Sequence, residues 1–121
     1  MPTHYRLDRD AKAIYIIHSG LMTDAEALRT AQEFAEVELE PGTVMIVDMR
    51  AVTQLRLTTE GMLRVIELFR GNPRVTRCAV VAGSDLALGA THMYQALRTD
   101  AETEMRAFRD EESALEWLGL S

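Results

Sequence analysis

Apolar runs of strand length alternate with amphipathic stretches along most of the chain. Two short runs, at residues 4–7 and 13–17, are separated by a charged turn, which predicts a β-hairpin. Two further runs, at residues 43–49 and 78–82, are almost continuously apolar and rich in β-branched residues, as is typical of strands covered on both faces. A last run at residues 105–108 predicts a short fifth strand.

Between these runs, apolar residues recur three or four positions apart, which predicts amphipathic helices. The first helix follows a capping box formed by Thr23 and Glu26, and Pro41-Gly42 is expected to end it. The second is expected over residues 59–70, and a short one near the carboxyl end of the chain. A third begins at residues 83–85. It is expected to bury a stripe made of Leu86, Ala90, Met93, Tyr94 and Leu97.

The element order ββαβαβαβα predicts an α/β fold in a single domain over residues 1–121. Strands that alternate with helices imply one mixed, mainly parallel sheet, here of about five strands with about four helices. The run at residues 43–49 is the expected central strand. Because open α/β sheets meet their ligands beyond the carboxyl ends of the strands, the loop expected between Met49 and Thr58 is the first place to look for function.

Composition narrows the classes of function. The formal net charge is -6 and no basic cluster interrupts it, which argues against nucleic acid as a partner. The single cysteine, Cys78, lies in an apolar run and is expected to be a buried thiol in a reducing compartment. The polar amino-terminal residues and the shortness of the apolar runs lead us to expect a cytoplasmic protein without membrane insertion.

Several segments resemble a known family. GTVMIVDMRAV, followed by a helix that opens with hydroxyl residues, resembles the STAS domains, typified by anti-sigma-factor antagonists. RVTRCAVVAGSDLALGATHMYQAL, followed by EMRAFRDEESALEWLG, is similar to the SpoIIAA-like STAS/SEC14 group of small bacterial proteins. This resemblance implies a SpoIIAA-like fold and a non-enzymatic regulatory role that works by docking a protein partner or a second copy of the chain as a homodimer.

The resemblance also implies a location for docking or switching. In antagonist-type STAS domains a phosphorylatable serine stands at the start of the helix after the acidic strand, and here Thr58 and Thr59 stand nearby. No serine is present, and Arg56-Leu57 replaces the expected acid, so a simple helix cap is the alternative. Asp48 and Arg50 complete this candidate set, with Asp48 alternatively an acceptor for loop amides.

A second hypothesis, from the likeness to SEC14-type carriers, is that the chain carries or senses a small apolar or anionic ligand. The candidate ligand residues are Ser84, Asp85, His92 and Met93, on the third helix and just before it, with an ordinary helix cap as the alternative for Ser84 and Asp85. An enclosed cavity would favour this hypothesis, whereas a fully packed interior would favour docking. A pocket of about 300 Å³ or more would use much of so small a core.

Catalytic and metal signatures are weak. The three histidines lack metal-ligand spacing, so neither a metal nor another cofactor is expected. Ser84, His92 and Asp48 or Asp85 can be assembled into a triad only on paper, since no G-x-S-x-G elbow positions the serine. Burial should raise the pKa of Cys78 and leave it inert. We therefore expect a protein that is not an enzyme, with a hydrolase as a remote alternative.

Overall fold

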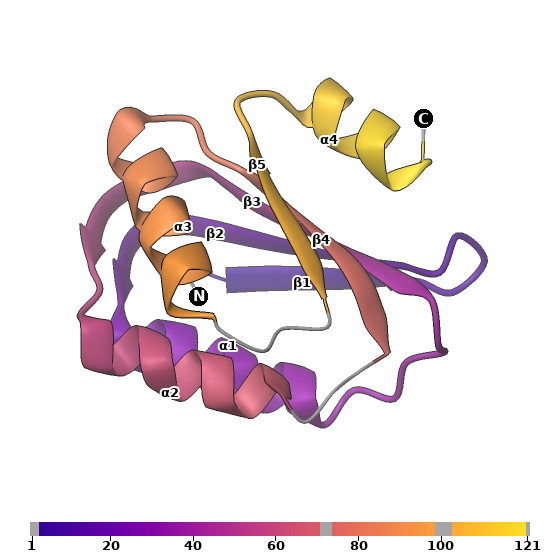
Figure 1. Cartoon of the computed structure of the whole chain (residues 1–121), viewed down its shortest axis with the longest axis horizontal. Helices are drawn as coiled ribbons and strands as arrows, with labels where there is room; N and C mark the ends of the chain where they lie inside the picture. The colour runs from indigo at the N-terminus through magenta and orange to yellow at the C-terminus, as the bar shows by residue number, and fades with distance from the viewer. Residues whose placement is uncertain (1–2, 71–73, 99–102, 121) are drawn as a thin grey trace.

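The computed structural model describes residues 3–70, 74–98 and 103–120, and its elements follow the order ββαβαβαβα (Figure 1). The strands are β1 (Thr3–Asp8), β2 (Ala13–Thr23), β3 (Thr43–Arg56), β4 (Val75–Val81) and β5 (Glu104–Phe108). The helices are α1 (Asp24–Ala35), α2 (Thr59–Arg70), α3 (Asp85–Leu97) and α4 (Glu111–Leu118). None of these helices is long and apolar enough to cross a membrane.

The strands form one sheet in the order β1-β2-β3-β4-β5. Only β1 runs antiparallel to its neighbour, and the other pairings are parallel. This confirms the predicted mixed, mainly parallel sheet with the strand at residues 43–49 in its centre. The apolar β-branched run there fits a strand whose two faces are both covered.

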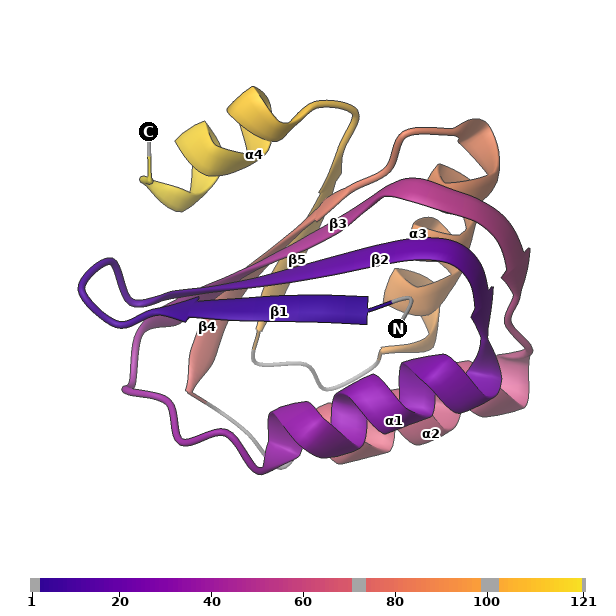
Figure 2. The ribbon, with the colours of Figure 1, turned by 180° about the vertical axis from the view of Figure 1, so that it is seen from behind.

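Helices cover the two faces of the sheet unequally. Successive residues of a strand point to opposite faces. On one face, Ile14 and Met45 pack with Phe34 of α1 in a core that α2 and α3 also border. On the other face, Ile46 and Ala79 pack with α4 alone. Figures 1 and 2 show α4 on the opposite side of the sheet from the adjacent helices α1 and α2.

The loop expected between Met49 and Thr58 is not a loop, because β3 continues to Arg56 and pairs with the second half of β2. Met22 is buried there, and Val52 and Leu55 pack against the core. The register between β2 and β3 shifts twice, after Ile17 and after Gly20, so the apolar residues do not keep a strand period of two. That irregularity made the segment look like a polar loop.

Two helix predictions also need correction. Helix α1 ends at Ala35, before Pro41-Gly42. In α3, Ala87 and Thr91 are buried, whereas Leu86 and Met93 of the predicted stripe are 62% and 51% exposed. The two candidate stripes lie next to each other on the helix and both contain apolar residues, so spacing alone did not separate them.

Thr58 caps α2 and joins it to α1. Its hydroxyl accepts the Gly61 N–H at 3.0 Å and donates to Asp24 Oδ2 at 2.5 Å. The Thr58 N–H donates to Asp24 Oδ1 at 2.8 Å. Since Asp24 is the first residue of α1, one carboxylate fixes the amino ends of both helices, and the cap predicted at this position is confirmed.

A matched pair of glycine substitutions tests this junction. Gly89→Ala should raise the free energy of unfolding by about 0.5–1 kcal/mol, because a Cβ there meets nothing within 4 Å and alanine favours a helix. Gly61→Ala should lower it, because its Cβ would fall 2.2 Å from Asp24 Cγ and displace the carboxylate from Thr58. Urea denaturation of both variants measures the difference, and equal gains would contradict the junction.

The two threonines should differ in the same assay. Thr58→Ala removes the cap and one partner of Asp24, so we expect it to lower the free energy of unfolding by about 1–2 kcal/mol. Thr59→Ala, at the exposed next position, should change it by less than about 0.5 kcal/mol. Equal effects would mean that Thr58 is not the residue that caps α2.

Candidate functional site

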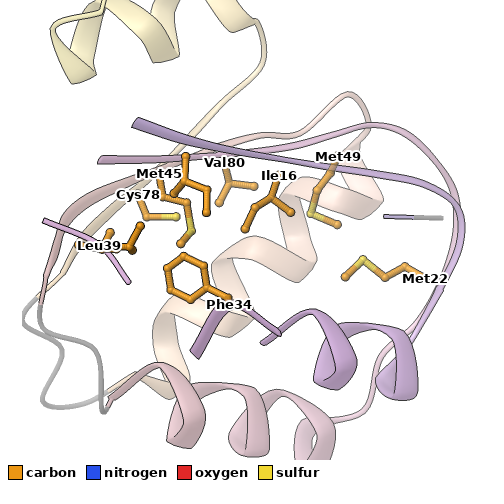
Figure 3. Close-up of a cluster of buried hydrophobic side chains, with 10 residues drawn as sticks. Ile16, Met22, Phe34, Leu39, Met45, Met49, Cys78 and Val80 are labelled. Atoms are coloured by element: carbon orange, nitrogen blue, oxygen red, sulfur yellow. The ribbon is translucent and has the colours of Figure 1, made fainter. Parts of the chain in front are cut away.

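An apolar cavity of about 450 Å³ lies between the sheet and helices α1, α2 and α3. Phe34 of α1 projects toward Met45 and Cys78 of the sheet, and Ile16 and Met49 lie farther along (Figure 3). Further apolar lining residues include Val47, Leu57, Met62, Val65, Ile66, Phe69, Val80 and Ala90. The volume falls within the roughly 300–1,000 Å³ of small-molecule sites.

Small residues on the helices leave this space open. Beside larger lining side chains such as Phe34, Phe69 and Tyr94, the helices contribute the small residues Ala27, Gly61 and Ala90 to the cavity wall. The methionines of the sheet and of α2 have flexible side chains that adapt to irregular shapes. The walls can therefore fit apolar ligands of more than one shape.

One polar side chain of the cavity is the buried imidazole of His18. Its Nδ1 lies 2.9 Å from Thr3 Oγ1. Burial lowers the His18 pKa to about 4, with the nearby Glu26 carboxylate acting in the opposite direction and Arg29 adding to the decrease. His18 is therefore neutral at pH 7 and offers hydrogen bonding rather than charge.

A second polar group lies where β4 and β5 begin. Arg98, just after α3, lines the cavity, and its Nη2 donates to the Thr103 carbonyl at 2.6 Å. Burial raises the pKa of the Cys78 thiol to about 12 and also raises the pKa of Tyr94, while the Arg98 charge lowers both. The predicted burial of Cys78 and the raised pKa of its thiol are confirmed.

The candidate docking residues lie away from the cavity. Asp48 alternates with Val47 and Met49, which line the cavity, and so faces the α4 side of the sheet. Arg50 donates to both Asp48 carboxylate oxygens, at 3.0 and 2.8 Å, and to Glu111 Oε2 at 2.8 Å. These hydrogen bonds lower the Asp48 pKa. Asp48 also accepts the Arg50 N–H at 3.0 Å, as the structural alternative predicted.

Thr58 and Thr59, the other members of that set, are exposed at the start of α2. The structure thus divides the four residues into an ion-paired cluster that reaches α4 and a helix cap that reaches α1. It does not bring them together into one site. Sequence analysis places them in one site because they lie within or beside the loop expected between Met49 and Thr58, which is part of β3 in the structure.

The predicted ligand residues lie on or beside α3 but outside the cavity wall. The Ser84 hydroxyl caps α3 by accepting the Ala87 N–H at 3.1 Å, and Asp85 pairs with Arg109 at 2.9 Å. His92 and Met93 are exposed. Tyr94 and Ala90 of the predicted stripe do line the cavity, and the lining residues that sequence reasoning missed include Thr91, Arg98 and His18. The position of Arg98, directly after a mainly apolar helix, was the sequence feature that could have identified it as a residue of the cavity wall.

Among the described residues, no group of three or more His, Cys, Asp and Glu side chains could hold a metal ion. The hydroxyls of Thr30 and Thr91 donate to carbonyls of their own helices, at 3.0 and 2.8 Å. The arrangement is suited to binding an apolar molecule, and its polar groups include the neutral imidazole of His18, the guanidinium of Arg98 and the phenol of Tyr94.

His18 should make stability depend on pH. Its pKa in the folded protein, about 4, lies below the ordinary 6.5, so the unfolded chain takes up the proton first as pH falls. The contribution of neutral His18 to the free energy of unfolding is fully present above pH 6.5 and is lost as the pH falls toward about 4. We therefore expect the free energy of unfolding, measured by urea denaturation, to fall between about pH 7 and pH 4.5. The fall should be about 2–3 kcal/mol larger in the wild type than in His18→Gln. His92→Gln, at an exposed histidine, should behave as the wild type does, and an unchanged pH dependence in His18→Gln would contradict the assignment.

Comparisons with known proteins agree with this fold. One solved structure is described as an uncharacterized protein from the DUF3478 family with a SpoIIAA-like fold from Shewanella loihica PV-4. It shares 17% sequence identity, with a TM-score of 0.61, over 96% of this chain and 91% of that one. None of the curated proteins matches the chain significantly. The family model described as SpoIIAA-like matches residues 13–119. The chain therefore belongs to the SpoIIAA-like family.

Proposed function

We propose that this chain is a non-enzymatic binding protein that carries or senses a small apolar ligand in the cavity under α1, α2 and α3. The observation that carries the proposal is the size of the cavity, about 450 Å³, in a protein of 121 residues. That volume is large enough for a small-molecule ligand. The walls are mainly apolar, so they favour an apolar molecule over water as the occupant.

The chemistry of the cavity supports binding rather than catalysis. Cys78 has a raised pKa and is therefore a poor nucleophile. His18 is neutral, and the residue beside its Nδ1 is Thr3 of the edge strand. Ser84, the serine of the remote hydrolase alternative, uses its hydroxyl to cap α3, and His92 on α3 is exposed.

The hypothesis of regulation by docking stays a prediction, as does self-association. Its switch version has little support, because the Thr58 hydroxyl is bonded to the Asp24 carboxylate. A phosphate on Thr58 would lie beside that carboxylate, where like charges repel. Of the two hypotheses, the cavity favours the carrier, since docking alone requires no internal space.

Filling the cavity tests the proposal. The wild type should bind the neutral apolar dye N-phenylnaphthylamine with a rise in fluorescence, and Ala90→Phe should weaken this binding by about tenfold or more because the added ring occupies the cavity. Ala96→Phe is the matched control, since it adds the same ring at an exposed position of the same helix.

The outcome is read as dissociation constants of the dye, with denaturation curves to verify that the variants are folded. Ala96→Phe should bind the dye as tightly as the wild type does. A wild type that does not bind the dye, or an Ala90→Phe variant that binds it unchanged, would overturn the proposed function.

A further inference from the structure

The cavity has a charged end, which bears on the kind of ligand it takes. Arg98 is the cavity-lining arginine, and its neighbours there, Val75, Thr103 and Met105, lie where β4 and β5 begin. His18 and Met49 lie midway along β2 and β3, and Met22 lies near the carboxyl end of β2. The cavity thus extends from a cationic end to a neutral one.

Within the described part of the chain, no carboxylate pairs with Arg98. Its guanidinium donates to the Thr103 carbonyl, and this bond satisfies one of the five N–H donors of a guanidinium. Other arginines of the protein do pair with acids, and they include Arg29, Arg50, Arg64, Arg77 and Arg109. A half-buried guanidinium beside apolar walls is stabilised most by an anion.

The surroundings of Arg98 show that its charge acts inside the cavity. It lowers the pKa of both Cys78 on β4 and Tyr94 on α3, although burial raises both more strongly. Tyr94 lies four residues before Arg98 and lines the same end. A head group placed there would meet a guanidinium fork and a protonated phenol, which are both donors.

We propose that the cavity binds a single-chain aliphatic carboxylate, with the carboxylate on Arg98 beside Tyr94 and the apolar chain directed toward Met49 and His18. This inference rests on the proposed function and adds the ligand class to it. The fork of Arg98 can hold both oxygens of a carboxylate, which a neutral alcohol head group cannot match. The neutral imidazole of His18 at the other end adds no competing charge.

Decanoate and decanol form a matched pair of ligands that differ in the head group. Each is titrated against the complex of the protein with N-phenylnaphthylamine, and displacement of the dye gives its affinity. The wild type should prefer decanoate over decanol by about 10- to 100-fold, the worth of charge-assisted hydrogen bonds. Arg98→Met should lose this preference and still bind decanol.

Two further variants keep the result interpretable. Arg98→Gln removes the charge but keeps an amide donor for the Thr103 carbonyl, so its loss of preference would not come from a loosened chain end after α3. Arg64→Met removes an arginine from the exposed face of α2, where it pairs with Glu60, and should keep the full preference for decanoate.

The inference and the proposed function fail in different ways. Equal affinity of the wild type for both ligands, or an unchanged preference in Arg98→Met or Arg98→Gln, would overturn the inference while leaving an apolar-ligand carrier. Failure of the dye to bind the wild type, or of both ligands to displace it, would overturn the proposed function and the inference together.

Discussion

The long parallel pairing of β2 with β3 positions the helices that border the cavity. These two strands extend beyond β4, and their far ends bend toward α1 and α2 (Figure 2). Helix α1 follows β2 directly, and only Leu57 and Thr58 separate β3 from α2. Both helices therefore start from the bent ends of the strand pair and run back beneath the sheet, with Asp24 fixing the two starts to each other. The cavity lies in the space that this arrangement encloses.

The opposite face of the sheet is packed differently, because the helix that covers it is α4 and not a helix that starts from the bent strand ends. There the buried core residues are mostly small, with Ala13, Ala79 and Ala114 fully buried, so α4 approaches the strands closely. Phe108 and Trp117 close the edge of this layer with ring centroids 5.6 Å apart. On the cavity face the sheet presents Met45 and Met49, and the helices present Ala90 and Gly61. The core is thus close-packed on one face and open on the other.

Much of the fold could be predicted because its signals are local. The strand at residues 43–49 could be predicted from its run of β-branched residues, and the cap of α3 from the hydroxyl of Ser84 directly before the helix. The bulges of β2 and the continuation of β3 past Met49 could not be predicted, because they depend on how two distant segments pair. The size of the cavity could not be predicted for a similar reason. Its volume depends on how closely the helices pack on the sheet, and no short sequence pattern determines that distance. A small rotation of α3 about its axis is enough to bury Ala87 and Thr91 in place of Leu86 and Met93, while Ala90 and Tyr94 of the predicted stripe still line the cavity.

The SpoIIAA-like architecture is kept here, and at the start of α2 the Thr58 hydroxyl is bonded to the Asp24 carboxylate. Family membership therefore supports the fold more directly than it supports a mechanism, and function has to be argued from the site. In the site, the decisive contrast is between a net charge of -6 over the whole chain and the guanidinium of Arg98, which lines the cavity. Exposed acids act on a distant anion through water and salt, which screen charges beyond about 8–10 Å. A guanidinium at the edge of an apolar space acts at contact distance and at a lower effective dielectric, so its attraction dominates for a ligand that has entered.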